Sequence, residues 1–188
     1  MSHEILPWRK LSTEQIADCK VFTVNRDRVC APGEPDEKAH SFFVIHPANW
    51  VNVIPITPDG KVLLIEQFRH GIEQVALEIP GGMIDPEDPS PEAAAARELL
   101  EETGYRADEI TIIGKHFPNP AIQNNVCYSI LARNVRQVQT PSMDGTEDIA
   151  MKLVPLEEIP ELIASGAITH ALVIVAFYYL ELWKKGQR

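Results

Sequence analysis

The pattern of apolar and polar positions predicts a chain that begins with strands and ends with helices. Runs rich in β-branched and aromatic residues, bounded by turn-forming residues, are typical of strands. Such runs occupy residues 20–29, 40–46, 51–57, 61–68, 74–79, 110–116, 126–132 and 149–155. Two helical patterns close the chain, at residues 156–165 and 170–184.

One further helix is expected in the middle of the chain. Ser90, Pro91 and Glu92 supply an N-cap, a proline at the first helical position and an acid in the first turn. Alanines and leucines follow as far as Gly104, a residue type that commonly ends helices. The sequence therefore predicts a helix over Pro91–Thr103.

The order of these elements predicts an α/β (α+β) fold. Strands come first, one helix is embedded among them, and an Asp-Gly turn at residues 59–60 favours a hairpin. Hairpins without regular βαβ repeats favour a mixed sheet covered by helices, an α/β/α sandwich. We expect a small antiparallel N-terminal sheet in a subdomain of residues 1–48, and the sandwich in residues 49–188.

Composition narrows the functional classes. The 188 residues, 45% of them apolar, suffice for one packed core, and a net charge of -10 argues against binding to nucleic acids or anionic membranes. The start lacks a signal-peptide pattern, and the apolar stretch at residues 171–180 is too short to span a bilayer. Three widely spaced cysteines fit free thiols, so we expect a cytoplasmic protein.

Three carboxylates crowd the end of the central helix. Glu98, Glu101 and Glu102 share one helical face, where each opposes the helix dipole by about 0.3–1 kcal/mol. Arg97 offers one positive charge against three negative charges. A hard divalent cation with oxygen ligands is the natural partner, with Mg²⁺ expected and Mn²⁺ as a substitute. The alternative is a solvated acidic helix end.

The segment from Gly82 to Tyr105 resembles the Nudix box, in which a glycine and a spaced acid precede Arg-Glu-aliphatic-x-Glu-Glu-x-Gly. The resemblance to Nudix hydrolases implies a Nudix-type sandwich and a metal-dependent pyrophosphohydrolase. It implies metal ligands at Glu98, Glu101, Glu102 and the carbonyl of Gly81. Glu98 and Glu101 then also count as catalytic residues, and Arg97 orients the carboxylates.

The resemblance leaves two acidic positions open. The loop between Gly82 and Arg97 is one residue longer than the family pattern, so either Glu87 or Asp88 supplies the acid that braces the loop. The family often takes its catalytic base from a loop beyond the box. The acidic loop at residues 144–148 matches, and we predict Glu147 as the base, with Asp144, Asp148 or an ordinary turn acid as alternatives.

Features outside the box resemble the branch that cleaves ADP-ribose and other nucleoside diphosphate sugars. They are residues 66–69, residues 77–80, and Pro120, which lies fifteen positions after Tyr105. Arg69 is expected to bind phosphate or the terminal sugar, with a surface ion pair to Glu66 or Glu73 as the alternative. Trp50 either stacks on a base or packs in the core. The residues expected to bind substrate are Arg69, Glu78, Gly82, Met83 and Trp50.

The sequence is also compatible with other functions. GDP-mannose, ADP-glucose or another nucleotide is an alternative substrate, because the box specifies pyrophosphate cleavage and not the flanking groups. A noncatalytic nucleotide-binding module is the alternative from another class, although retention of all three glutamates favours an enzyme. Members of the family are commonly homodimers in which the N-terminal sheet helps to build the partner's base pocket, so we expect a homodimer.

Overall fold

The computed structural model of the chain describes residues 4–142 and 148–186. It divides the chain into two compact units. The first unit comprises Met1–Ala48 together with Phe117–Asn125, and the second comprises Asn49–His116 together with Val126–Arg188. The sequence pattern did not assign Phe117–Asn125 to the first unit.

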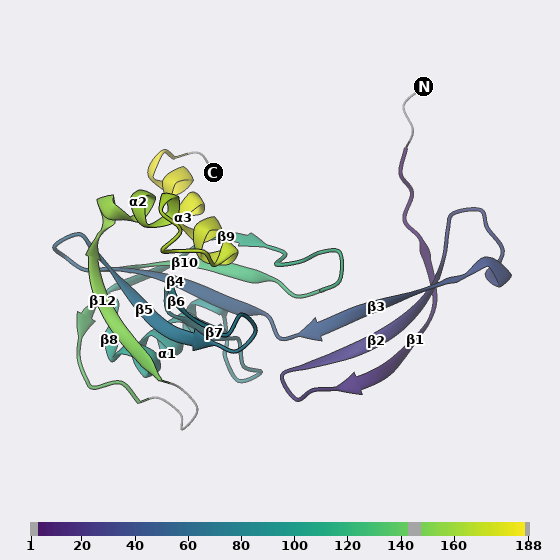
Figure 1. Cartoon of the computed structure of the whole chain (residues 1–188), viewed down its shortest axis with the longest axis horizontal. Coiled ribbons are helices and arrows are strands. Elements are labelled where there is room, and N and C mark those ends of the chain that lie inside the picture. Colours follow the sequence, from purple (N-terminus) through teal and green to yellow (C-terminus); the bar gives the residue numbers. More distant parts are fainter. Residues whose placement is uncertain (1–3, 143–147, 187–188) are drawn as a thin grey trace. The chain divides into compact units, whose positions relative to one another are not determined.

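The first unit contains an antiparallel sheet of three strands, β1 (Arg9–Asp18), β2 (Phe22–Cys30) and β3 (His40–Pro47) (Figure 1). A short 3-10 helix, η1 (Asp36–Lys38), lies between β2 and β3. Strand β1 was not predicted, because its mostly exposed and polar residues do not alternate. Its pairing with β2 includes an ion pair of 2.5 Å between Lys10 and Asp27.

The second unit is built on a mixed sheet. The order is β12-β5-β4-β10-β9, with β6 paired to β5 and β7 paired to β4. Strands β4 and β10 are parallel, whereas the other pairs are antiparallel. The strands are β4 (Trp50–Ile56), β5 (Lys61–Arg69), β6 (Gln74–Glu78), β7 (Gly81–Met83), β9 (Glu109–His116), β10 (Cys127–Arg133) and β12 (Ile149–Pro155). A separate ribbon joins β8 (Tyr105–Arg106) to β11 (Arg136–Gln137).

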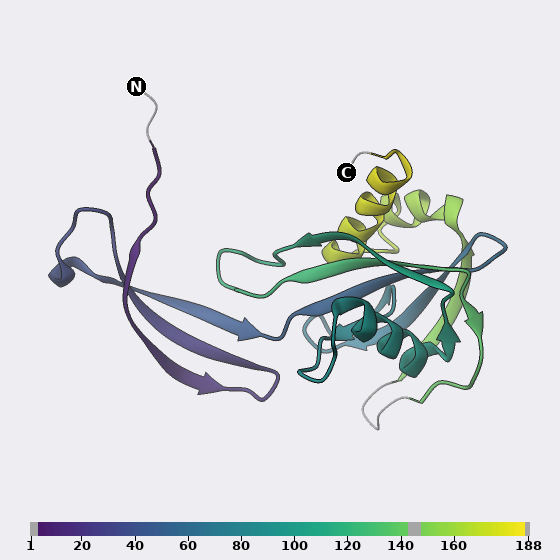
Figure 2. The same cartoon turned by 180° about the vertical axis from the view of Figure 1, so that it is seen from behind.

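Helices cover both faces of this sheet. Helix α1 (Pro91–Thr103) lies on one face, and α2 (Ile159–Ala164) and α3 (Ala171–Lys184) lie on the other, as Figures 1 and 2 show. A 3-10 turn, η2 (Leu156–Glu158), precedes α2. The predicted α/β/α sandwich with a mixed sheet is confirmed. Among the described residues, no helix has the length and apolar character needed to cross a membrane.

Strand β4 separates two hydrophobic clusters by simple alternation. Val51 and Val53 pack with Leu99 in the cluster on the α1 face, whereas Ile54 packs with Phe177 in the cluster on the α3 face. Because side chains two residues apart in a strand share a face, Asn52 also faces the α3 side of the sheet. A polar side chain therefore interrupts an otherwise apolar surface.

Leu99 anchors α1 to the sheet and offers a test of this packing. Leu99→Ala is expected to lower the free energy of unfolding by about 2–5 kcal/mol, because the fully buried side chain would leave a cavity. Urea unfolding followed by circular dichroism measures the change. The matched control Leu153→Ala is expected to cost at most about 1 kcal/mol, since that leucine is already 43% exposed. Equal losses in both variants would contradict the packing.

Candidate active site

Capping interactions at both ends of α1 determine at which residues this helix begins and ends. The Ser90 side chain accepts a hydrogen bond of 3.2 Å from the Ala93 amide, and Pro91 occupies the first turn. At the other end Gly104 adopts a left-handed conformation with φ of 74°, and its amide donates to the Leu100 carbonyl. Glu98, Glu101 and Glu102 lie in the last two turns of α1, as predicted, and the last turn contains no basic residue.

Two glycines of β7 bring the backbone directly against these carboxylates. The Gly81 amide donates a hydrogen bond of 3.0 Å to the Glu102 carboxylate, which is only 4% exposed. A Cβ atom at Gly82 would lie 2.4 Å from the carboxylate carbon of Glu98. Any side chain at Gly82 would therefore displace Glu98, and only glycine permits this close approach.

Arg97 ties the loop after β7 to the acidic helix end. Its guanidinium donates to the Asp88 carboxylate at 2.8 and 3.2 Å, to Glu98 at 2.9 Å and to Glu101 at 3.2 Å. It also donates to the Met83 carbonyl at 3.0 Å. The hydrogen bond with Asp88 is the main cause of a raised pKa at Arg97 and of a lowered pKa at Asp88. One cation is thus shared among several carboxylates.

The loop acid left open by the sequence is Asp88. Besides binding Arg97, its carboxylate accepts a hydrogen bond of 2.9 Å from the Asp85 amide, which braces the loop after β7. Glu87 is exposed. The extra residue in the loop therefore does not remove the brace.

The oxygen atoms at the end of α1 are chemically suited to bind a hard divalent cation. Three carboxylates and the backbone of Gly81 supply only oxygen ligands, the type that Mg²⁺ prefers. No group of three His, Cys, Asp or Glu side chains in the described part of the chain is already arranged as a metal site. Arg97 and the Gly81 amide hold these carboxylates instead, so metal binding requires part of these contacts to rearrange.

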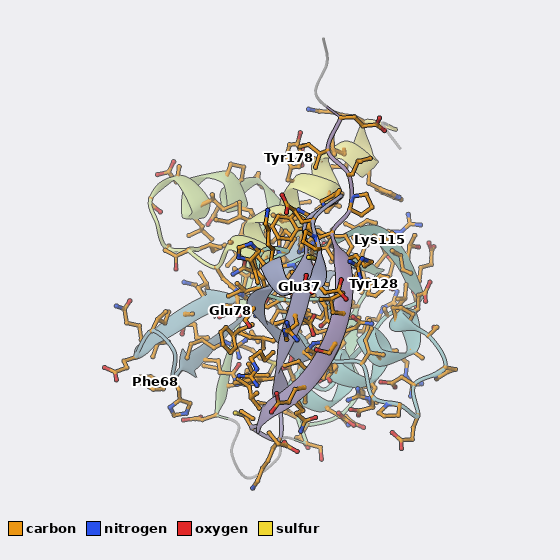
Figure 3. All side chains as sticks on the ribbon, turned by 90° about the vertical axis from the view of Figure 1, so that its right-hand side faces the viewer. Glu37, Phe68, Glu78, Lys115, Tyr128 and Tyr178 are labelled. Atoms are coloured by element: carbon orange, nitrogen blue, oxygen red, sulfur yellow. The ribbon has the colours of Figure 1, made fainter. Side chains whose placement is uncertain are left out.

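A second charged cluster lies between the β5–β6 hairpin and the start of α3. Arg69 donates to both oxygens of Glu78, at 2.9 and 2.8 Å, and His170 Nδ1 lies 3.1 Å from Glu78 Oε2. Burial alone would raise the pKa of Glu78, which is 3% exposed, but the contacts with His170 and Arg69 outweigh burial and hold it at about 2. Figure 3 shows Phe68 at the edge of the view and Glu78 nearer its middle, and Phe68 is 47% exposed.

A cavity of about 830 Å³ brings all five predicted substrate residues together. This volume is within the usual range of about 300–1,000 Å³ for small-molecule sites. Its lining includes Trp50, Arg69, Glu78, Gly82 and Met83, together with the metal-ligand candidate Gly81. The alternative for Arg69 was a surface ion pair with Glu66 or Glu73, but the structure pairs Arg69 with the buried Glu78, on the cavity wall.

Sequence reasoning missed four polar residues of this cavity, Asn52, Gln74, Thr169 and His170. Asn52 had a detectable signal, since it is the polar residue between Val51 and Val53 in an apolar run. His170 had only its position before a long apolar segment. Two candidates for the base, Asp144 and Glu147, lie outside the described residues, and Asp148 is exposed before β12.

Comparisons with known proteins agree with this geometry. The family model of the NUDIX domain matches residues 46–176. An ADP-ribose pyrophosphatase of Bacillus subtilis is 30% identical over 175 residues, which cover 93% of this chain and 92% of that protein. A GDP-mannose pyrophosphatase of Yersinia enterocolitica is 29% identical over 133 residues, covering 66% of this chain and 69% of that protein.

A solved crystal structure of an ADP compounds hydrolase is similar over nearly the whole chain. It is 25% identical, covers 99% of this chain and 98% of its own, and superposes with a TM-score of 0.85. The chain belongs to the Nudix family.

The buried pair of Arg69 and Glu78 predicts a pH-dependent change in stability. Arg69→Met is expected to lower the free energy of unfolding at pH 7 by roughly 2–3 kcal/mol. This is less than for a fully buried pair, because the Arg69 side chain is 42% exposed. Since the pKa of Glu78 is lowered from 4.5 to about 2, the stabilisation is complete above pH 4.5 and is lost as pH falls toward 2.

Urea unfolding of wild type and variant between pH 7 and pH 2 measures this dependence. The difference between the two proteins should shrink as the pH falls from about 4.5 to about 2. Lys61→Met, which removes the exposed partner of Asp59, serves as the control and should cost less than about 1 kcal/mol. A difference that stays constant over the whole pH range would contradict the ion-pair account.

Proposed function

We propose that the protein hydrolyses the pyrophosphate bond of a nucleoside diphosphate sugar, with ADP-ribose, cleaved to AMP and ribose 5-phosphate, as the leading substrate. The observation that carries this proposal is the contact of Gly81 and Gly82 with the carboxylates of α1 beside a cavity of about 830 Å³. The names of the related proteins, an ADP-ribose pyrophosphatase and an ADP compounds hydrolase, support the same substrate class.

The residues at the end of α1 would hold a divalent cation, Mg²⁺ or Mn²⁺ as its substitute. The ligands would be Glu98, Glu101, Glu102 and the Gly81 carbonyl. When bound, the ion neutralises pyrophosphate oxygens and lowers the pKa of a bound water. Arg97, which already contacts Glu98 and Glu101, would orient the carboxylates.

We propose Glu147 as the general base that positions or deprotonates the attacking water. The support is the strand that follows its loop. Ile149, at the start of β12, pairs with Gln67 on β5, two residues from Arg69. Asp144 and Asp148 are the alternatives from the same loop.

Product analysis tests the proposed activity. The protein is incubated with Mg²⁺ and ADP-ribose, ADP-glucose, GDP-mannose or a nucleoside triphosphate, and the products are separated by chromatography with mass detection. Chelator-sensitive formation of AMP and ribose 5-phosphate is the expected result. Preferred cleavage of GDP-mannose would favour the alternative suggested by the Yersinia relative. Cleavage of none of these compounds would favour a noncatalytic nucleotide-binding module.

Glu102 provides the sharpest single-residue test of the metal-binding helix end. Glu102→Gln keeps an acceptor for the Gly81 amide but removes the negative charge, so the turnover rate should fall on the order of 100-fold or more. Steady-state kinetics with Mg²⁺ measure the rate, and urea unfolding checks the fold. Glu92→Gln, in the first turn of the same helix, is the matched control and should retain activity. A near-wild-type rate in Glu102→Gln would refute the metal assignment.

We further propose that the protein is a homodimer that associates through its three-stranded sheet. Large apolar side chains are exposed on this sheet and the segment before it, including Trp8 at 47% and Phe42 at 49%. The Trp8 and Phe42 rings meet edge to face at 5.9 Å. Clustered exposed aromatic groups are typical of protein interfaces.

Phe42→Asp tests this association. The added charge should shift the protein from dimer to monomer in light scattering, because a desolvated carboxylate is costly in an apolar interface. Ser41→Asp adds the same charge to the adjacent position, whose side chain points to the opposite face of β3. Two variants with the same mass as the wild-type protein would rule out an interface at Phe42.

A cytoplasmic location is the proposal that best fits the thiols. Cys19, Cys30 and Cys127 are free, and disulfides are rare in reducing compartments. The net charge of -10 supports a small-molecule substrate over nucleic acid or a membrane surface.

A further inference from the structure

Three residues that line the cavity of the second unit, Trp50, Asn52 and His170, have a buried side-chain nitrogen without a hydrogen-bond partner among the described residues. His170 Nδ1 lies 3.1 Å from Glu78 Oε2, whereas Asn52 has no such neighbouring charge in these contacts. Asn52 lies on β4, lines the cavity and is 8% exposed. Its amide nitrogen is buried and has no hydrogen-bond partner within the part of the chain that the structure describes. A buried donor without a partner costs free energy, so a ligand in the cavity that Asn52 lines is the natural partner for this donor.

The pairing of β4 with β7 places the Asn52 side chain beside Gly81 and Gly82, the two glycines that approach the carboxylates of α1. Asn52 pairs with Gly81 on β7, and a Cβ atom at Gly81 would lie 3.1 Å from Asn52 Oδ1. Gly82, the next residue, faces Glu98 on the other side of the sheet. A substrate whose pyrophosphate lies at the carboxylates would therefore extend its adjoining group past Gly81 toward Asn52.

The other groups of the cavity identify the chemistry of that adjoining group. Glu78 is an ionised acceptor, Arg69 is a donor, and Ile72 and Ala76 add apolar surface. Phosphoryl oxygens only accept hydrogen bonds and would be repelled by the Glu78 carboxylate. Sugar hydroxyls both donate and accept, and a sugar ring also presents apolar C–H surface, so a sugar matches this mixture.

We propose that Asn52 is a specificity-determining residue whose amide donates a hydrogen bond to a hydroxyl of the terminal sugar, the sugar on the far side of the pyrophosphate from the nucleoside. This proposal takes the class of substrate, a nucleoside diphosphate sugar, from the proposed function. It adds the residue that distinguishes a nucleoside diphosphate sugar from a plain nucleoside diphosphate.

Asn52→Leu separates binding from a structural role. Leucine has a similar size and removes the unsatisfied amide, so the variant should unfold at the same or a higher urea concentration than the wild-type protein. A structural amide would give the opposite result, a loss of stability. Ser129→Ala is the matched control, because Ser129 pairs with Asn52 on the neighbouring strand β10 and has a buried hydroxyl without a partner among the described residues, but does not line the cavity.

The experiment compares the affinities of ADP-ribose and ADP by calorimetry, with chelator present so that no hydrolysis occurs. Wild type and Ser129→Ala should bind ADP-ribose more tightly than ADP. Asn52→Leu should lose about tenfold in affinity for ADP-ribose, with ADP unchanged. Unchanged affinity for ADP-ribose, an equal loss for both ligands, or no binding of either ligand to the wild-type protein would overturn the proposal.

Hydrolysis is measured separately with Mg²⁺ and without chelator. Binding that depends on Asn52 in a wild-type protein that cleaves nothing would refute the proposed function and leave the role of Asn52 intact. Cleavage of ADP-ribose with the same KM in wild type and Asn52→Leu would refute the role of Asn52 alone.

Discussion

The close approach of β7 to the end of α1 is the contact on which the site depends. The Gly81 amide binds Glu102, and Gly82 leaves room for the Glu98 carboxylate where any Cβ atom would collide with it. Packing makes this approach possible, because Leu99 holds α1 against the sheet between the two acidic positions. Capping at Ser90 and Gly104 then fixes which helical turn faces the glycines.

Because side chains alternate along β4 and β7, the groups of the site are distributed over the two faces of the sheet. Gly82 and Val51 face α1 and its carboxylates, whereas Asn52 faces the α3 side, and all three residues line the cavity. The β7 backbone passes between the two, so a bound pyrophosphate and the sugar attached to it would meet different chemistry. Acidic oxygens suited to a cation lie on one face, and the pair of Arg69 and Glu78 contributes a donor and an acceptor on the other.

Much of the fold could be predicted from the sequence because its signals are local. The N-cap, proline and glycine gave the bounds of α1, and apolar runs gave most strands of the sheet. Strand β1 was not predicted because it is polar and exposed, and β7 was not predicted because glycine and proline normally end strands. These elements form through pairing with distant strands, which no local pattern encodes.

The residues of the candidate site that belong to a sequence motif could be predicted from the sequence. Motif reading found the glutamates of α1, Arg69 and Glu78, but not the contacts that join them. The choice of Asp88 over Glu87 needed the loop geometry, and the cavity role of Asn52 needed the pairing of β4 with β7. Glu147 lies outside the described residues and stays a prediction.

Electron paramagnetic resonance of added Mn²⁺ tests most directly whether the glycine turn and the acidic helix end form a cation site. The signal of free Mn²⁺ should decrease on titration with the wild-type protein. It should persist with the folded double variant Glu98→Gln, Glu102→Gln, because two of the carboxylate ligands would be neutral. Equal uptake of Mn²⁺ by both proteins would contradict the account.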